Sequence, residues 1–294
     1  MNIYEIHKSN PGIITQLTLK DLLFCYYECP QKEKVVQLYS NHNQLTFTLS
    51  GKRIVRHGIK KWTLNKKQGF LLKRGAFYQE LPYFYAGWKV LVIYLKDDYL
   101  RRIFEEFRPY LALENLPEVD VEMIQEFTIN DKIKNSYKSL LPYFSNPQLL
   151  PDSIFEGKFK ELLFNIFIHP NNKQILAYIN QIIDNYTIPV WEIMESNYYY
   201  DLKISEFAEI ANRSTSTFRR DFAKHYQTSP GKWLTNKRLE KAMLLLKTSD
   251  KPISDITFDC GFKNISHFSK IFKEKFGLSP TSYRMLNKMH KCPE

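Results

Sequence analysis

Residues 261–280 read GFKNISHFSKIFKEKFGLSP, and residues 212–230 read NRSTSTFRRDFAKHYQTSP. Both stretches follow one pattern: Asn or Gly, a polar cap, an aromatic helix with basic side chains, and a terminal Ser-Pro pair. The offset between the two copies is 49 residues when Ile204 is aligned with Ile253, and 50 residues from Phe218 and Phe268 onward. So many aromatic and proline matches at a nearly constant offset indicate one structural unit that occurs twice.

Each unit predicts a helix, a tight turn and a second helix. The first helices end at Asn212 and Gly261, and these residue types tolerate the left-handed backbone that closes a helix. The second helices start after good N-caps, Ser214 and Asn264. Two helices joined by a tight turn are typical of the helix-turn-helix, whose second helix enters the major groove of DNA.

The second helix of each unit has an aromatic inner face and a polar outer face. Phe218 and Phe222 in one copy, and Phe268 and Phe272 in the other, are spaced to point inward. The outward residues of the two copies are Ser216, Arg219 and Arg220, and Ile265, Ser266, His267 and Lys270. Two such helices on one rigid frame would read two successive major grooves, about 34 Å apart.

The frame is the helix predicted between the units, GKWLTNKRLEKAMLLLK at 231–247, which follows the first Ser-Pro pair. Ser-Pro places an N-cap before a proline at the first helical position. The apolar residues of this helix face the cores of both units, so ordinary core packing would itself hold the two recognition helices at a fixed separation.

These motifs resemble the DNA-binding domain of the AraC/XylS family of bacterial transcription regulators. The resemblance covers about a third of the chain, through KISEFAEIANRSTSTFRRDF, SPGKWLTNKRLEKAMLLL and ISDITFDCGFKNISHFSKIFKEKFGLSP. It implies a monomeric domain that binds asymmetric promoter sites, with RNA polymerase as a partner. Carried over by position, the outward residues named above become the base readers, and Arg238 joins them as a DNA-binding residue. Ile265 departs from the polar residue usual there, and we expect it to contact a thymine methyl or the sugar-phosphate backbone.

The first part of the chain predicts a different architecture. From Val35 to Leu95 short β-branched and aromatic runs alternate with Gly or Asn turns, which favours an antiparallel sandwich or barrel. The segments HNQLTFTLSGKRIVRHG and GFLLKRGAFYQ look like the cupin-like domain with which family members sense a ligand or protein partner and dimerise. The predicted fold class is thus α+β, with a cupin-like sensory and dimerisation domain at 1–187 and an all-α double helix-turn-helix domain at 188–294.

Amphipathic helices follow the strands. Their apolar stripes comprise Phe159, Leu162, Leu163, Ile166 and Phe167, and then Ile175, Leu176, Ile179, Ile182 and Ile183. Such stripes usually pack inside their own domain, and a homodimer contact is the alternative.

The charge distribution agrees with a nucleic-acid partner. Residues 201–294 hold 18 Lys and Arg against 10 Asp and Glu, so +8 of the net charge of +11 falls there. Such a domain favours a polyanion, nucleic acid or an anionic membrane surface, although a merely soluble basic surface is the plain alternative. Residues 1–16 lack the apolar core of a signal peptide and no run could span a membrane, which predicts a cytoplasmic, nucleoid-associated protein.

No cofactor or metal is expected. Cys25 and Cys29 would supply only half of a zinc site, while His42 and His57 stand alone, without the His-x-His of metal-binding cupins. We therefore predict a sequence-specific transcription regulator, more often an activator in this family, and no enzyme. Two alternatives are an enzyme on the cupin barrel fused to a DNA-targeting module, and a nonspecific architectural DNA-bending protein.

Overall fold

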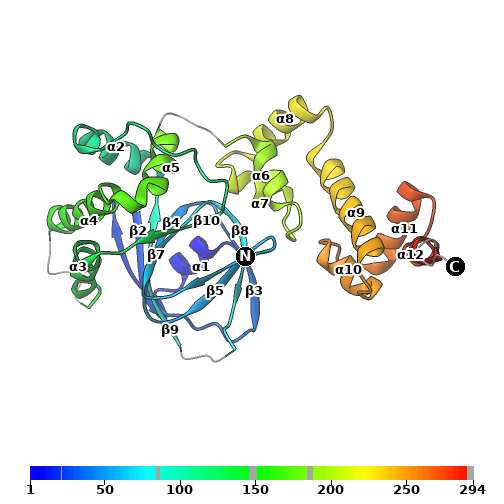
Figure 1. Ribbon diagram of the computed structural model, residues 1–294, viewed down its shortest axis with the longest axis horizontal. Helices are drawn as coiled ribbons and strands as arrows, with labels where there is room; N and C mark the ends of the chain where they lie inside the picture. Colours follow the sequence, from blue (N-terminus) through cyan, green and yellow to red (C-terminus); the bar gives the residue numbers. More distant parts are fainter. Residues whose placement is uncertain (21, 84–86, 146–150, 184–187, 290–294) are drawn as a thin grey trace. The chain divides into compact units, whose positions relative to one another are not determined.

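The chain divides into two units, Met1–Thr187 and Ile188–Glu294 (Figure 1). The structure is a computed structural model and describes residues 1–20, 22–83, 87–145, 151–183 and 188–289. The first unit combines sheets and helices, and the second is helical.

The N-terminal unit is built on two antiparallel sheets. Within the described residues, one sheet has six strands in the order β1-β2-β9-β4-β7-β10, and the other has four in the order β3-β8-β5-β6. The strands are β1 (Thr15–Leu19), β2 (Leu22–Glu28), β3 (Val35–Ser40), β4 (Asn43–Gly51), β5 (Arg53–His57), β6 (Lys60–Leu64), β7 (Gln68–Leu72), β8 (Gly75–Glu80), β9 (Trp88–Leu95) and β10 (Ile124–Thr128).

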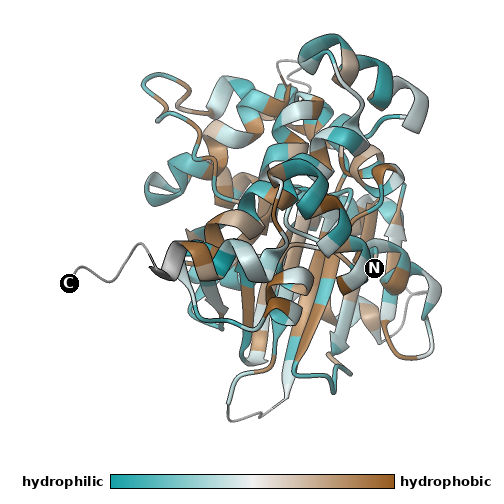
Figure 2. Ribbon diagram, turned by 90° about the vertical axis from the view of Figure 1, so that its right-hand side faces the viewer, coloured by the Kyte–Doolittle hydropathy of each residue, from teal (hydrophilic) through white to brown (hydrophobic). Residues whose placement is uncertain are grey.

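The central strand β9 is apolar on both faces of the larger sheet. Its sequence WKVLVIYL is apolar at almost every position, and it pairs with β2 on one side and β4 on the other. Figure 2 shows apolar residues, in brown, along the strands of this unit. A strand that is apolar on both faces needs a covering layer on each.

Two apolar cores supply these layers. Phe24, Phe47 and Ile93 face a core formed with α2 (Asp97–Phe107), α3 (Asp131–Leu140), α4 (Asp152–Phe167) and α5 (Lys173–Ile183). Val90 and Phe70 face the second core, which lies between the sheets and includes the short helix α1 (Ile3–Ser9). Figure 1 shows α2–α5 gathered on one side of the larger sheet.

The stripes of α4 and α5 lie in the first of these cores. All ten stripe residues are buried within the unit itself, Phe159, Leu162 and Ile166 completely. Since these side chains already pack against the sheet, the structure supports the core interpretation of the stripes, and a homodimer would have to use another surface.

The C-terminal unit contains the repeat. Its helices are α6 (Val190–Asn197), α7 (Ile204–Ile210), α8 (Thr215–Tyr226), α9 (Pro230–Thr248), α10 (Ile253–Asp259), α11 (Ile265–Phe276) and α12 (Pro280–Met289). The pairs α7–α8 and α10–α11 are the two helix-turn-helix units, with α9 between them. Asn212 and Gly261 end the first helices with positive φ angles of 51° and 78°. The predicted fold class, strands first and then a double helix-turn-helix, is confirmed.

Candidate nucleic-acid interface

The helix α8 presents the first predicted reader set to solvent. Ser214 caps its N-terminus, with its side-chain oxygen accepting a 3.2 Å hydrogen bond from the Thr217 amide. Phe218 and Phe222 are fully buried beneath the helix. Ser216, Arg219 and Arg220 are all exposed. The cap fixes where the helix begins, and the buried Phe pair fixes which face looks outward.

The two arginines of α8 differ in their neighbours. Nε of Arg220 lies 3.7 Å from Asp221, whose other carboxylate oxygen accepts a 2.5 Å hydrogen bond from Arg213. No acidic side chain in the described part of the chain lies within ion-pair distance of Arg219. The Arg219 guanidinium therefore projects without a competing partner, whereas Arg220 is drawn toward Asp221.

The helix α11 repeats this arrangement with other chemistry. Asn264 caps it by accepting a 2.9 Å hydrogen bond from the His267 amide, and Phe268 and Phe272 are fully buried. Ile265, Ser266, His267 and Lys270 are exposed on the outer side. The structure thus brings each predicted set together on one helix, and only Lys270 carries a fixed positive charge in the second set.

Helix α9 holds the two units in one frame. Near its start, Trp233 packs edge to face on Phe222, with ring centroids 5.6 Å apart. Further along, Leu239, Ala242 and Leu246 enter the core that contains Phe268 and Phe272. The helix is therefore part of the packing of both units, as the sequence pattern indicates.

Arg238, which is predicted to contact DNA, lies half-buried among backbone carbonyls of its own unit. Its guanidinium donates hydrogen bonds to three backbone carbonyls, at 3.0 Å to Tyr198, 2.5 Å to Tyr200 and 3.1 Å to Gly261. A guanidinium has five N–H donors and no acceptor, and the three carbonyls occupy one donor on each of its three nitrogens. Arg238 thus joins the segment before α7, the helix α9 and the turn before α11.

Sequence reasoning missed the part that α6 plays beside the first unit. Trp191 of α6 stacks on His225 of α8, with centroids 3.9 Å apart and planes 7° from parallel. One turn along, the Tyr226 hydroxyl donates to the Glu195 carboxylate. No sequence signal linked Trp191 to His225, because the stack depends on how α6 packs on α8.

The histidines that were considered as metal ligands have other contacts. His42 stacks on Tyr4, with centroids 4.2 Å apart, and Nδ1 of His57 lies 2.8 Å from the Ala76 carbonyl. The described residues contain no group of three or more His, Cys, Asp or Glu side chains placed to hold a metal ion. The same part of the chain contains no helix with the length and apolarity to span a bilayer.

Comparison with known proteins places both units. Residues 207–285 match the family model described as "Helix-turn-helix domain", and residues 43–178 match the "ExsA N-terminal regulatory domain". An uncharacterized HTH-type transcriptional regulator of Haemophilus influenzae is 40% identical over 84 residues, which is 29% of this chain and 28% of that protein. The HTH-type transcriptional regulator ExsA of Pseudomonas aeruginosa is 28% identical over 43% of this chain and 46% of its own length.

A third relative matches over a longer range. The virulence regulon transcriptional activator VirF of Yersinia enterocolitica is 22% identical over 83% of this chain and 90% of its own length. The chain spans less than half of the other two relatives.

Among solved structures, apo ToxT of Vibrio cholerae aligns over 92% of this chain and 98% of its own, with 14% identity and a TM-score of 0.43. The DNA-binding domain of AdpA, in complex with a target DNA, aligns over 35% of this chain and 96% of its own, with 27% identity and a TM-score of 0.33. With a helix-turn-helix match at 207–285 and an ExsA-type match at 43–178, the chain is similar to AraC-type transcription regulators in both of its units.

Proposed function

We propose that the chain is a sequence-specific transcription regulator, acting as an activator, whose helices α8 and α11 enter two successive major grooves of promoter DNA. The observation that carries the proposal is the pair of capped helices with exposed polar faces, both packed on α9. Such helices present their N-terminal residues to base edges, and a spacing of about 34 Å corresponds to one turn of DNA. The relatives named above as transcriptional regulators and activators support the same function.

In this proposal the two helices read DNA by different means. Arg219 makes the main base contact of α8, since an arginine can grip guanine with two hydrogen bonds, while Arg220 and Ser216 contact phosphate or bases nearby. On α11, Ser266, His267 and Lys270 supply hydrogen bonds and charge. Ile265 supplies an apolar contact, for which the methyl group of thymine is the natural partner.

In this proposal the N-terminal unit regulates the activity of the DNA-binding unit. We assign to it the response to a small-molecule or protein effector, and any homodimerisation, while contact with RNA polymerase would follow DNA binding. The protein would act in the cytoplasm, on nucleoid DNA, and would carry out no catalytic step of its own.

Selection of binding sites from random DNA by the full-length protein tests the proposal. We expect a bipartite site whose two parts are separated by about one helical turn, ~10 bp. The matched variants Arg219→Ala and Lys270→Ala should change base preference in opposite parts of that site. Binding without any base preference, falling uniformly with salt, would instead indicate an architectural DNA-binding protein.

A further inference from the structure

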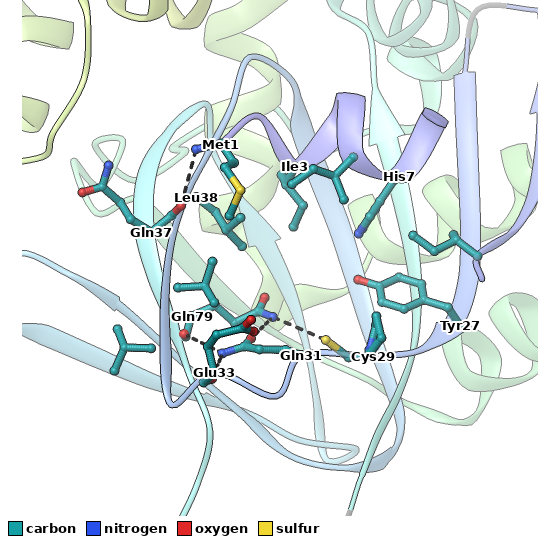
Figure 3. A pocket seen from close by; sticks show the side chains of 15 residues that line it. Met1, Ile3, His7, Tyr27, Cys29, Gln31, Glu33, Gln37, Leu38 and Gln79 are labelled. Carbon is teal, nitrogen blue, oxygen red and sulfur yellow. Dashed lines mark hydrogen bonds between the residues drawn. The ribbon is translucent and has the colours of Figure 1, made fainter. Parts of the chain in front are cut away.

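A cavity of about 590 Å³ lies in the N-terminal unit (Figure 3). Segments far apart in sequence line it: helix α1, the end of β2 with the residues that follow it, β3, and Gln79 of β8. Its volume falls in the range of ligand pockets, which run from roughly 300 to 1,000 Å³. The cavity belongs to this unit alone, so its lining does not depend on the C-terminal unit.

The hydroxyl of Tyr27 points into this cavity (Figure 3). The Tyr27 side chain is 6% exposed and packs edge to face on His7, with ring centroids 4.7 Å apart. Within the described residues, the Tyr27 hydroxyl makes no hydrogen bond with another group of the protein. Figure 3 shows it directed into the space between the lining side chains. Because this hydroxyl faces the cavity and has no partner among the described groups, a ligand atom in the cavity can accept a hydrogen bond from it.

The polar side chains of Gln31, Gln79 and His7 in the lining are hydrogen-bonded and neutral. The Gln79 amide donates to Oε1 of Gln31 at 2.8 Å, and the Gln31 amide donates to the Glu33 carbonyl at 2.7 Å. His7 is 3% exposed, and its Nδ1 lies 2.8 Å from the Tyr94 hydroxyl. Burial lowers the pKa of His7 to about 3, so its ring is uncharged near neutral pH. The rest of the lining is largely aliphatic and includes Ile3, Ile14, Val36 and Leu38.

Charge is nearly absent from the lining. The lining contains no Lys or Arg side chain; its charged groups are the exposed Glu33 carboxylate and the amino group of Met1, which donates to the Gln37 carbonyl at 3.4 Å. The guanidinium of buried Arg53 lies over the Trp88 ring, 5.2 Å from its centroid, and Arg53 is outside the lining. Burying a carboxylate or an ammonium without an opposite charge is strongly unfavourable, so these walls select against charged ligands.

We propose that this cavity binds an uncharged aliphatic molecule with one carbonyl or ether oxygen, which accepts a hydrogen bond from the Tyr27 hydroxyl while the chain packs along Ile3, Ile14 and Val36. The proposal rests on the effector role of the N-terminal unit and names the chemistry of the ligand. Its tests use no DNA, so they can succeed or fail independently of DNA binding.

Calorimetric titration of the full-length protein with four probes of similar length tests the chemistry. The probes are methyl decanoate, decanoate, decylamine and undecane, each kept below its aggregation limit. Methyl decanoate should bind at least tenfold more tightly than decanoate or decylamine, because the two charged groups of the lining, at Met1 and Glu33, belong to exposed residues, and the buried lining residues carry no charge to pair with either ion. Equal or tighter binding of decanoate, or no binding of any probe, would overturn the proposal.

Substitutions test whether the ligand binds in this cavity. Tyr27→Phe should weaken methyl decanoate binding about fivefold, the effect of one hydrogen bond of ~1 kcal/mol, and leave undecane binding unchanged. Tyr99→Phe is the matched control, since Tyr99 is buried in the core of α2–α5 and should leave both affinities unchanged. Val36→Phe should weaken both probes by filling the space. Unaltered methyl decanoate affinity in Tyr27→Phe would show that the hydroxyl is not the ligand's partner.

Discussion

Arg238 of α9 contacts Gly261, in the turn before α11, within the C-terminal unit. Nη1 of Arg238 donates a 3.1 Å hydrogen bond to the Gly261 carbonyl, and a β-carbon added at Gly261 would lie 2.9 Å from Cζ of Arg238. The glycine also has a φ of 78°, in the left-handed region. Gly261 thus serves two needs at once: it closes α10 and leaves room for the guanidinium that ties α9 to the turn before α11.

Gly261→Ala should lower the free energy of unfolding more than Gly277→Ala does. Gly277 has the same φ of 78°, but a β-carbon there would meet nothing within 4 Å. Backbone strain alone costs about 1–2 kcal/mol, so Gly277→Ala should lose about that much free energy of unfolding. Gly261→Ala should lose at least ~1 kcal/mol more, because Arg238 must shift and its hydrogen bond weakens. Denaturant unfolding measures both losses. Equal losses would mean that the Arg238 side chain can move aside without lowering the stability of the protein.

Arg238→Lys should loosen the geometry between the two recognition helices. A lysine ammonium cannot reproduce the planar fork that bonds to Tyr198, Tyr200 and Gly261 at once. We expect the variant to accept a wider range of spacings between the two parts of the DNA site, with base preferences within each part unchanged. Selection from a DNA library of varied spacings measures this. If Arg238 instead contacted DNA, base preference or overall affinity would fall and the preferred spacing would stay.

The repeat could be predicted closely from sequence because its signals are local. Caps such as Ser214 and Asn264, and a left-handed glycine at 261, are fixed within a few residues, and all are where the pattern puts them. Arg238 could not be assigned in this way. Its partners lie 23 to 40 residues away, and an exposed arginine on a helix has the same local pattern as a buried one.

The N-terminal unit was predicted less completely. Short β-branched and aromatic runs between turns predict the strands from Val35 to Leu95, but β1 and β2 lie before that stretch, and β10 lies among helices. The sequence of β2, LLFCYYE, is apolar without alternation because both of its faces are buried. The cavity was also missed, since its lining comes together only when α1, β2, β3 and β8 assemble.

Arg219→Ala should weaken DNA binding more than Arg220→Ala. Nε of Arg220 is 3.7 Å from Asp221, whereas no acid in the described residues holds Arg219. An arginine that grips guanine with two hydrogen bonds contributes about 1–3 kcal/mol of base discrimination. Affinities for the selected site and for a site with that guanine replaced separate base contact from phosphate contact. Equal losses on both sites, or a larger loss for Arg220→Ala, would contradict the assignment.

The N-terminal unit should lose stability as the pH falls below about 6.5. Burial lowers the pKa of His7 to about 3, below its ordinary value of 6.5 in the unfolded chain. Between these values the unfolded state binds one proton more, so the contribution of His7 is complete above pH 6.5 and decreases by roughly 1.4 kcal/mol per pH unit below it. The fall in the free energy of unfolding from pH 7 to pH 5 should be about 2 kcal/mol smaller in His7→Asn than in the unchanged protein. An unchanged difference would mean that His7 does not carry this pH dependence.

Ile179→Lys should unfold the N-terminal unit and not merely separate a dimer. Ile179 is 1% exposed and packs in the core formed by α2–α5 and the larger sheet. A lysine there would bury an unpaired charge, with an expected loss of more than about 3 kcal/mol. Lys173→Glu, at an exposed position of the same helix, also changes charge but should leave stability within about 0.5 kcal/mol. Thermal unfolding and sedimentation of both variants decide the question: a folded, monomeric Ile179→Lys protein derived from a dimeric parent would show that the stripe is an interface after all.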